Sequence, residues 1–221
     1  MGRRRSVQLR VVTVRWATVA WMMWVVLPGC RKGSPGHASP TVSLSRTPDG
    51  AAIAGATEVV FTATVSASGD ALAVSWDLGD GQKASGASVV HVYAKEGVFP
   101  VAVTASDTGG GVTTVGSSIT VGSLSGRWLL SEGGERFYER GFDITQTTSD
   151  LSGRPFSVPD QRCLGDLHGR VVSPRIIRFD FTGCDDNVVR VDGTAVSDLR
   201  SIPGRYTHPD GPPQAMVLTR E

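Results

Sequence analysis

The stretch Ser75-Trp76-Asp77-Leu78-Gly79-Asp80-Gly81 decides how the middle of this chain folds. The apolar residues before and within this stretch alternate with small or polar residues; they are Leu72, Val74, Trp76 and Leu78. This period of two is that of a strand with one buried face. The run ends in Asp80-Gly81, a strong hairpin signal, and a large indole just before such a turn can anchor a small core. The stretch therefore predicts a strand of a β-sandwich.

The same alternation extends from Thr41 to about Gly122, with no helical period. The apolar positions are Val59, Phe61, Ala63 and Val65, then Val90 and Val92, then Phe99, Val101, Val103 and Ala105, then Val115, Ile119 and Val121. Turn signals rich in Gly and Asp separate these runs. Six or seven short strands at this spacing predict an all-β sandwich over residues 41–122.

This segment resembles the PKD domain, an immunoglobulin-like β-sandwich. The residues that carry the resemblance are Trp76, Asp77, Leu78, Gly79, Asp80 and Gly81, then His91, Val92 and Tyr93, then Gly97, Val98 and Phe99, with Val101, Val103 and Asp107. Leu78 stands where the family usually has Phe, which is a tolerated core change. Pro100 lies inside a strand and cannot donate a backbone hydrogen bond, so we expect its amide side to be unpaired or bulged.

The resemblance implies contacts with proteins or carbohydrates, or a role as a spacer. We expect Trp76, His91 and Tyr93 to pack in the core. Asp77 and Asp80 could bind calcium, but acids beside a glycine turn usually accept backbone hydrogen bonds and need no metal. We therefore predict no cofactor here.

The first 29 residues have the composition of a secretory leader. Five arginines and no acids precede an apolar run from Trp16 to Leu27, which is too short for a stable membrane span. Leu27-Pro28-Gly29-Cys30 resembles the lipobox of bacterial lipoproteins, in which the cysteine is acylated. This resemblance implies a membrane anchor at Cys30. Residues 31–40 are rich in Gly, Ser and Pro and cannot bury a core, so we expect a flexible tether over residues 30–40. Because Arg31 follows the cysteine, we expect the outer membrane; a secretory signal with a chance cysteine is the alternative.

Charge argues against a nucleic-acid partner. The whole chain has 22 basic and 21 acidic residues, and loss of the five leader arginines would leave 17 basic residues. A mildly acidic chain with scattered charges does not offer a surface for nucleic acid.

Residues 123–221 have a different texture, richer in Arg, Asp and Pro, again without a helix of three turns. We expect strands at residues 126–130, 142–146, 151–153, 164–172, 175–181, 188–196 and 215–220. A small antiparallel β-barrel or sandwich of six to eight strands follows. Gly126-x-Trp128 and Arg220 resemble the ends of lipocalin-like barrels, which implies that Arg220 stacks over Trp128 and that the barrel mouth could hold a small apolar ligand.

Cys163 and Cys184 lie ten residues to either side of the break at Ser173-Pro174. In a hairpin centred there they fall opposite one another, and an oxidising compartment would join them, so we predict a disulfide. Two free thiols or a metal pair are the alternatives to the disulfide, and a longer loop with a shifted register is the alternative to this hairpin.

Motifs of catalysis are missing from the sequence, including nucleophile elbows, zinc pairs and phosphate loops. His168 could form an acid–base pair with Asp166 or Asp180, and Asp185-Asp186 could contribute to a cation site, but a half-exposed histidine and a loop are the simpler interpretations. We predict a lipid-anchored, non-catalytic envelope module for an unknown protein or polysaccharide. A small-ligand carrier and an enzyme accessory are the alternatives.

Overall fold

The computed structural model describes residues 38–67, 72–157, 165–183 and 186–221. The predictions on Cys30, Cys163, Cys184 and Asp185 lie outside these residues. Every element in the described part is a β-strand, so the all-β prediction is confirmed. Within the same residues, no helix has the length and hydropathy needed to cross a membrane.

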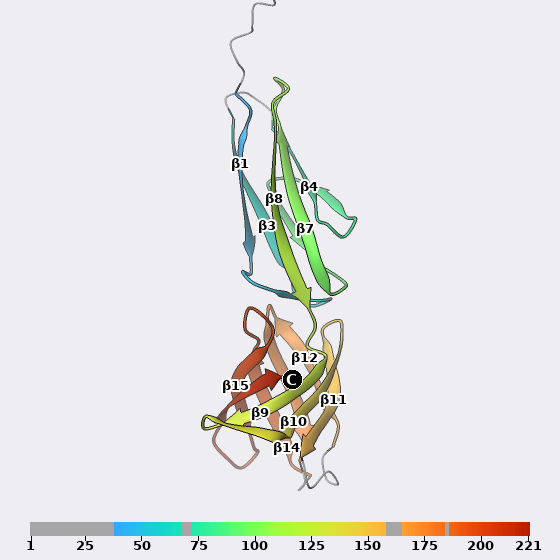
Figure 1. The fold of residues 1–221 in the computed structure, drawn as a ribbon. Helices are drawn as coiled ribbons and strands as arrows, with labels where there is room; N and C mark the ends of the chain where they lie inside the picture. The colour runs from blue at the N-terminus through green and yellow to red at the C-terminus, as the bar shows by residue number, and fades with distance from the viewer. Residues whose placement is uncertain (1–37, 68–71, 158–164, 184–185) are drawn as a thin grey trace, which may run out of the picture. The chain divides into compact units, whose positions relative to one another are not determined.

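Residues 41–122 form two facing sheets (Figure 1). The first sheet has the order β1 (Thr41–Thr47), β3 (Val59–Ser66) and β6 (Ser88–His91). The second has the order β2 (Ala52–Ile53), β8 (Val112–Gly122), β7 (Gly97–Ser106), β4 (Ala73–Asp77) and β5 (Lys83–Ser85). All pairs are antiparallel except β2 with β8.

The sandwich core follows the predicted alternation at most positions. Phe61, Trp76, Leu78 and Val103 are all buried between the sheets. Burying one such side chain stabilises the fold by about 1.5–3 kcal/mol.

Three apolar positions of the predicted pattern face outward instead. Leu72 is 39% exposed and precedes β4, and Val90 and Val92 are 60% and 38% exposed. On and just after β6 the inward positions belong to His91 and Tyr93, because neighbouring residues of an extended chain point to opposite faces. Val90 and Val92 were therefore wrongly placed in the core.

Pro100 is accommodated within β7 without a bulge. The register with β8 runs through Pro100 and Ser118 without a shift, while the pairing with β4 ends at Ala102. Pro100 therefore lies beyond the residues paired with β4. A Cβ at Gly79 would overlap the Pro100 carbonyl, and Gly79 has φ +82°, so this turn requires glycine.

Residues 126–220 form a closed eight-stranded barrel of consecutive antiparallel strands (Figure 1). The strands are β9 (Gly126–Glu132), β10 (Glu135–Thr147), β11 (Asp150–Ser157), β12 (Leu167–Ser173), β13 (Ile176–Thr182), β14 (Val188–Thr194), β15 (Ser201–Thr207) and β16 (Gln214–Arg220). Closure comes from the pairing of β16 with β9. It leaves no free sheet edge in the barrel.

Sequence reasoning missed β15. Ile202-Pro203-Gly204 interrupts its alternation, and proline normally argues against an inner strand. Pro203 is tolerated because it is paired with Val217 of β16, whereas the pairing with β14 begins only at Gly204.

Strand glycines let the barrel close tightly. A Cβ at Gly141 would overlap the carbonyl oxygen of Trp128, and one at Gly204 would overlap the carbonyl of Asp192. Gly141 also lies where the register of β10 against β9 shifts. A larger residue at either position would push two paired strands apart.

The segment around β2 contacts the barrel as well as β8. Ala51 and Ile53 belong to the buried cluster that contains Trp128 and Ile144. The Ala51 amide donates to the Ser197 carbonyl at 2.7 Å, and the Gln146 side-chain amide donates to the Ala54 carbonyl at 2.8 Å. Residues 37–221 accordingly form one compact unit.

Candidate ligand pocket in the barrel

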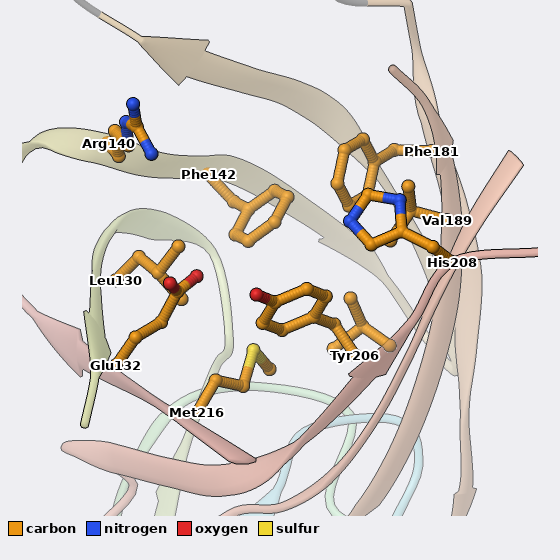
Figure 2. Close-up of a pocket in the computed structure, with 10 residues that line it drawn as sticks. Leu130, Glu132, Arg140, Phe142, Phe181, Val189, Tyr206, His208 and Met216 are labelled. Carbon is orange, nitrogen blue, oxygen red and sulfur yellow. The ribbon is translucent and has the colours of Figure 1, made fainter. Parts of the chain in front are cut away.

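A pocket of about 200 Å³ lies within the barrel (Figure 2). Its lining comes from six strands and from His208, just after β15. The lining residues are Leu130, Glu132, Arg140, Phe142, Phe181, Val189, Val191, Tyr206, His208 and Met216. Closure of the barrel brings strands that are far apart in the sequence together around this pocket.

Trp128 is not among the residues that line this pocket. Its side chain is fully buried, and its ring nitrogen donates to the Leu124 carbonyl at 2.8 Å. The predicted contact with Arg220 is present, since the guanidinium carbon lies 6.0 Å from the Trp128 ring centre. Arg220 also donates to the carbonyls of Ser123 and Ser125, at 3.0 and 2.6 Å. These contacts join the last strand to the start of β9.

Aromatic rings and a thioether form the apolar part of the pocket. Phe142 meets Phe181 edge to face, with ring centres 5.1 Å apart. Met216 is buried, and Phe181 and Tyr206 are partly buried. Such surfaces favour a flat or flexible apolar ligand.

The polar part of the pocket centres on Glu132 and Tyr206. Figure 2 shows the Glu132 carboxylate facing the Tyr206 hydroxyl. Burial raises the pKa of Tyr206, and the negative charge of Glu132 and a hydrogen bond to it raise it further, while Arg140 opposes the shift. The Tyr206 hydroxyl also lies 2.7 Å from the Gln214 side-chain oxygen. The His208 ring meets Tyr206 edge to face, with ring centres 5.5 Å apart.

The residues of the PKD-like motif make structural contacts. Trp76 is buried, and its ring nitrogen donates to the Gly86 carbonyl at 2.8 Å. Asp77 accepts a hydrogen bond from the Gly79 amide, and Asp80 accepts one from Gln82, both at 3.0 Å. Both carboxylates thus hold the turn between β4 and β5.

His91 connects this turn to the core. Its Nε2 lies 2.7 Å from Asp80 Oδ2, and its ring meets Tyr93 edge to face at 4.5 Å. Burial alone would raise the pKa of the Asp80 carboxyl, but the Gln82 amide and His91 together hold it below its usual value. Tyr93 is buried and donates to the Leu78 carbonyl at 2.9 Å. Gly97 has φ +151° where β7 begins.

The hypothetical acid–base pair at His168 is not formed. His168 is exposed and opposite Asp180 in the register, but the Asp180 carboxylate receives two hydrogen bonds from Arg190. Asp166 is paired with Arg154 at 3.0 Å. Both carboxylates therefore neutralise arginines on the barrel surface.

Metal ligands are not gathered in the described part of the chain, which contains no cluster of three or more His, Cys, Asp or Glu side chains. Asp186 is exposed in the loop after β13. The described register of β12 with β13 pairs Leu167 with Phe181 and is displaced by one residue from the register that the disulfide prediction assumed.

Sequence reasoning did not find the pocket. Its residues lie on five strands of the predicted set and on β15, which was missed, and no motif links them. Glu132 precedes the Gly133-Gly134 turn, and an acid beside a turn is usually a surface residue. Only the strand order brings Glu132 and Tyr206 together.

Comparisons with known proteins concern mainly the sandwich. Residues 37–121 match the family described as "PKD domain". The curated Collagenase ColA of Clostridium perfringens is 40% identical over 53 residues, which cover 24% of this chain and 5% of that protein. The chain thus spans about a twentieth of that relative.

Solved structures give similar matches. The PKD1 domain of Vibrio anguillarum Epp is 21% identical, with 40% of this chain and 99% of that domain covered and a TM-score of 0.34. The PKD1 domain of the Vibrio cholerae metalloprotease PrtV is 25% identical, with 39% and 100% covered and a TM-score of 0.34. A structure of carbohydrate-binding modules from the β-sandwich superfamily is 12% identical, with 84% and 86% covered and a TM-score of 0.39. The prediction from the Trp76–Gly81 motif is confirmed, and residues 37–121 are a PKD domain.

Proposed function

We propose that the chain is a non-catalytic interaction module held at the outer membrane by a lipid on Cys30, with a protein of the cell envelope as its partner. The PKD match of residues 37–121 is the observation that carries this proposal. The motif residues Trp76, Asp80 and His91 hold the fold, so binding falls to the outer surfaces of the sandwich.

The composition of the sandwich favours a protein over a polysaccharide. Sugar rings are commonly gripped by exposed aromatic rings, yet Phe61, Trp76 and Tyr93 are buried and Phe99 packs against the core. The outer face of the second sheet instead carries a row of hydroxyl side chains across four neighbouring strands. In register order these are Ser85, Ser75, Thr104 and Thr114. These hydroxyls give the sheet an outward polar face that a partner could contact.

The hydroxyl row can be tested in cells with a photo-crosslinking residue at Thr114 of the full chain. We expect crosslinks to one envelope protein, which a Ser75→Arg change in the same row should abolish. Ser43 on the other sheet is the matched control, because Ser43→Arg adds the same bulk and charge at a distant exposed position. Binding of the chain to purified envelope polysaccharide that survives both changes, without a protein crosslink, would contradict the protein partner.

The anchor has its own test. Metabolic labelling with a fatty-acid analogue should mark the chain and should be lost in Cys30→Ser. Labelled chain that fractionates with the inner membrane would contradict the outer-membrane assignment, and label that persists in Cys30→Ser would contradict the anchor.

The proposed disulfide between Cys163 and Cys184 closes a loop of about 20 residues, which would contribute about 3 kcal/mol. Chain isolated from the envelope without reductant should show no free thiol at these positions after denaturation. Two thiols that react fully with maleimide would contradict the pairing.

A second candidate function is the carriage of a small ligand, and the pocket in the barrel favours it. Its wall combines apolar and aromatic side chains with the polar groups of Glu132, Arg140, Tyr206 and His208, the two kinds of side chain that small-molecule sites use.

A further inference from the structure

The pocket combines aromatic rings and a thioether with a carboxylate. Phe142, Phe181 and Tyr206 contribute aromatic rings, and Met216 contributes a polarizable sulfur. Aromatic rings attract cations through their negative faces, and this attraction strengthens where water is displaced. A carboxylate among such rings adds a full negative charge.

That carboxylate belongs to Glu132. It faces the Tyr206 hydroxyl in the middle of the polar side, while Arg140 lies on another part of the wall (Figure 2). The negative charge of Glu132 is a larger influence on Tyr206 than the positive charge of Arg140. A carboxylate is therefore the charged group beside the Tyr206 hydroxyl, where a ligand's polar group would lie.

We propose that the barrel pocket binds a small organic ammonium ion, an amine or methylated amine on a short apolar body. The apolar body lies against Phe142, Phe181 and Met216, and the ammonium lies between Glu132 and the Tyr206 ring. This assignment rests on the carrier function proposed above and gives it a ligand class.

Volume limits the size of the ligand. An apolar cavity of about 150 Å³ can hold benzene, and this pocket measures about 200 Å³. A phenyl ring with a short amine-bearing chain, roughly ten non-hydrogen atoms in all, matches that space. Long acyl chains exceed it.

Three probes with the same body and different heads test the charge preference. They are 3-phenylpropylamine, 3-phenylpropanol and 3-phenylpropionate, titrated against the full chain. Met216 is the one methionine beyond the leader, since the others are Met1, Met22 and Met23. A carbon-13 methyl label on methionine, assigned with Met216→Leu, therefore places a signal inside the pocket.

We expect the amine to shift the Met216 signal and to bind about tenfold more tightly than the alcohol, because an ion pair adds to the shared apolar contact. The propionate should bind more weakly than the alcohol, since its charge repels Glu132. These comparisons use the unaltered chain and do not depend on a variant folding.

A variant then assigns the preference to one residue. Glu132→Gln keeps the shape of the side chain and removes its charge, so the amine should lose about tenfold in affinity while the alcohol changes less than about twofold. Glu96→Gln, at an exposed turn of the sandwich, is the matched control and should change neither.

The outcomes separate the ligand class from the carrier function. Tighter binding of the propionate, or an amine no tighter than the alcohol, overturns the ammonium assignment and leaves carriage in place. No shift of Met216 with any probe at millimolar concentration overturns both. An amine preference that survives in Glu132→Gln overturns the role of Glu132.

Discussion

Tyr93 shows how a single side chain holds three parts of the sandwich together. Its hydroxyl donates to the Leu78 carbonyl, its ring stacks on Phe99 with centres 4.6 Å apart, and its edge contacts involve His91. The turn after Trp76 is thereby tied to β7. Asp77 and Asp80, the candidate calcium ligands of the sequence, accept backbone hydrogen bonds in this turn.

Removing this hydroxyl should destabilise the sandwich. Tyr93→Phe keeps the ring but leaves the buried Leu78 carbonyl without its donor, so we expect a loss of about 1–3 kcal/mol in unfolding free energy. Denaturant unfolding measures it. Tyr206→Phe removes the hydroxyl of a less buried tyrosine, so the loss of unfolding free energy should be smaller. An equal or larger loss in Tyr206→Phe would contradict the claim that burial makes the Tyr93 hydrogen bond important.

Alkaline pH should weaken the sandwich through the same residue. Burial raises the pKa of Tyr93 to about 12, helped by the charge of Asp80 and opposed by Arg46. An unfolded tyrosine ionises near pH 10, so the stabilising contribution is complete below about pH 10 and is lost as pH rises toward 12. Unfolding curves at pH 9–12 should show this loss, and it should be smaller in Tyr93→Phe. Identical pH profiles would refute it.

At the scale of the strand, the barrel depends on backbones that approach closely and on one arginine. Gly141 lets β10 lie against β9, and Arg220 holds β16 to the residues before β9. The two residues act on the same strand, β9, from opposite sides.

Gly141→Ala should therefore be far more damaging than a usual glycine change. The added methyl overlaps the Trp128 carbonyl, so we expect a loss of more than about 3 kcal/mol or failure of the barrel to fold. Gly116 of β8 is the matched control, because its nearest neighbour would be 3.8 Å away. Similar melting temperatures for Gly116→Ala and Gly141→Ala would contradict the argument.

Arg220→Lys tests the arginine contacts. Lysine keeps the charge but cannot span two carbonyls or stack a planar group over Trp128, and we expect a loss of about 1–2 kcal/mol. Arg200→Lys is the control, because Arg200 directly precedes β15 and its carbonyl accepts a hydrogen bond from the Arg220 amide. A loss equal to that of Arg200→Lys would show that charge alone matters.

The sequence predicts those elements that depend on local patterns of residues, and it does not predict those that depend on the pairing of distant strands. Local alternation and Asp80-Gly81 predicted most of the sandwich strands but not β2 or β5. The resemblance carried by Trp128 and Arg220 predicted their contact, which lies between the two strands that close the barrel. The buried position of Tyr93 was expected from the sequence, and the outward position of Val92 follows from it, because neighbouring residues of an extended chain point to opposite faces. Glu132 and Tyr206 meet only through closure, a long-range event that no local pattern encodes.

At the scale of the whole molecule, Ile53 links the two β structures. It belongs to a two-residue strand paired with β8, yet its side chain is buried in the cluster that fills the barrel. The Thr57 hydroxyl accepts a hydrogen bond from the Ile53 amide at 2.9 Å. The domain boundary between residues 122 and 123 stays a prediction. Because the Ile53 side chain is buried in the barrel core, we expect the stabilities of the sandwich and the barrel to be coupled.

Ile53→Ala should lower the stability of sandwich and barrel together, by about 2–5 kcal/mol for a buried isoleucine. The Met216 methyl signal reports the barrel and the His91 ring signal reports the sandwich during one thermal unfolding series. We expect both to shift to lower temperature. Val90→Ala, an exposed position, should move neither; a shift of only one reporter in Ile53→Ala would contradict the coupling.

Closure of the barrel by β16 has a consequence for the order of synthesis. All strands of the sandwich have been made once the chain reaches Gly122. The barrel has to wait for residues 214–220, since β16 alone pairs with both β9 and β15. Until then two strand edges stay open to pairing with other chains. The nascent chain therefore passes through an interval in which every sandwich strand is present but the barrel is still open.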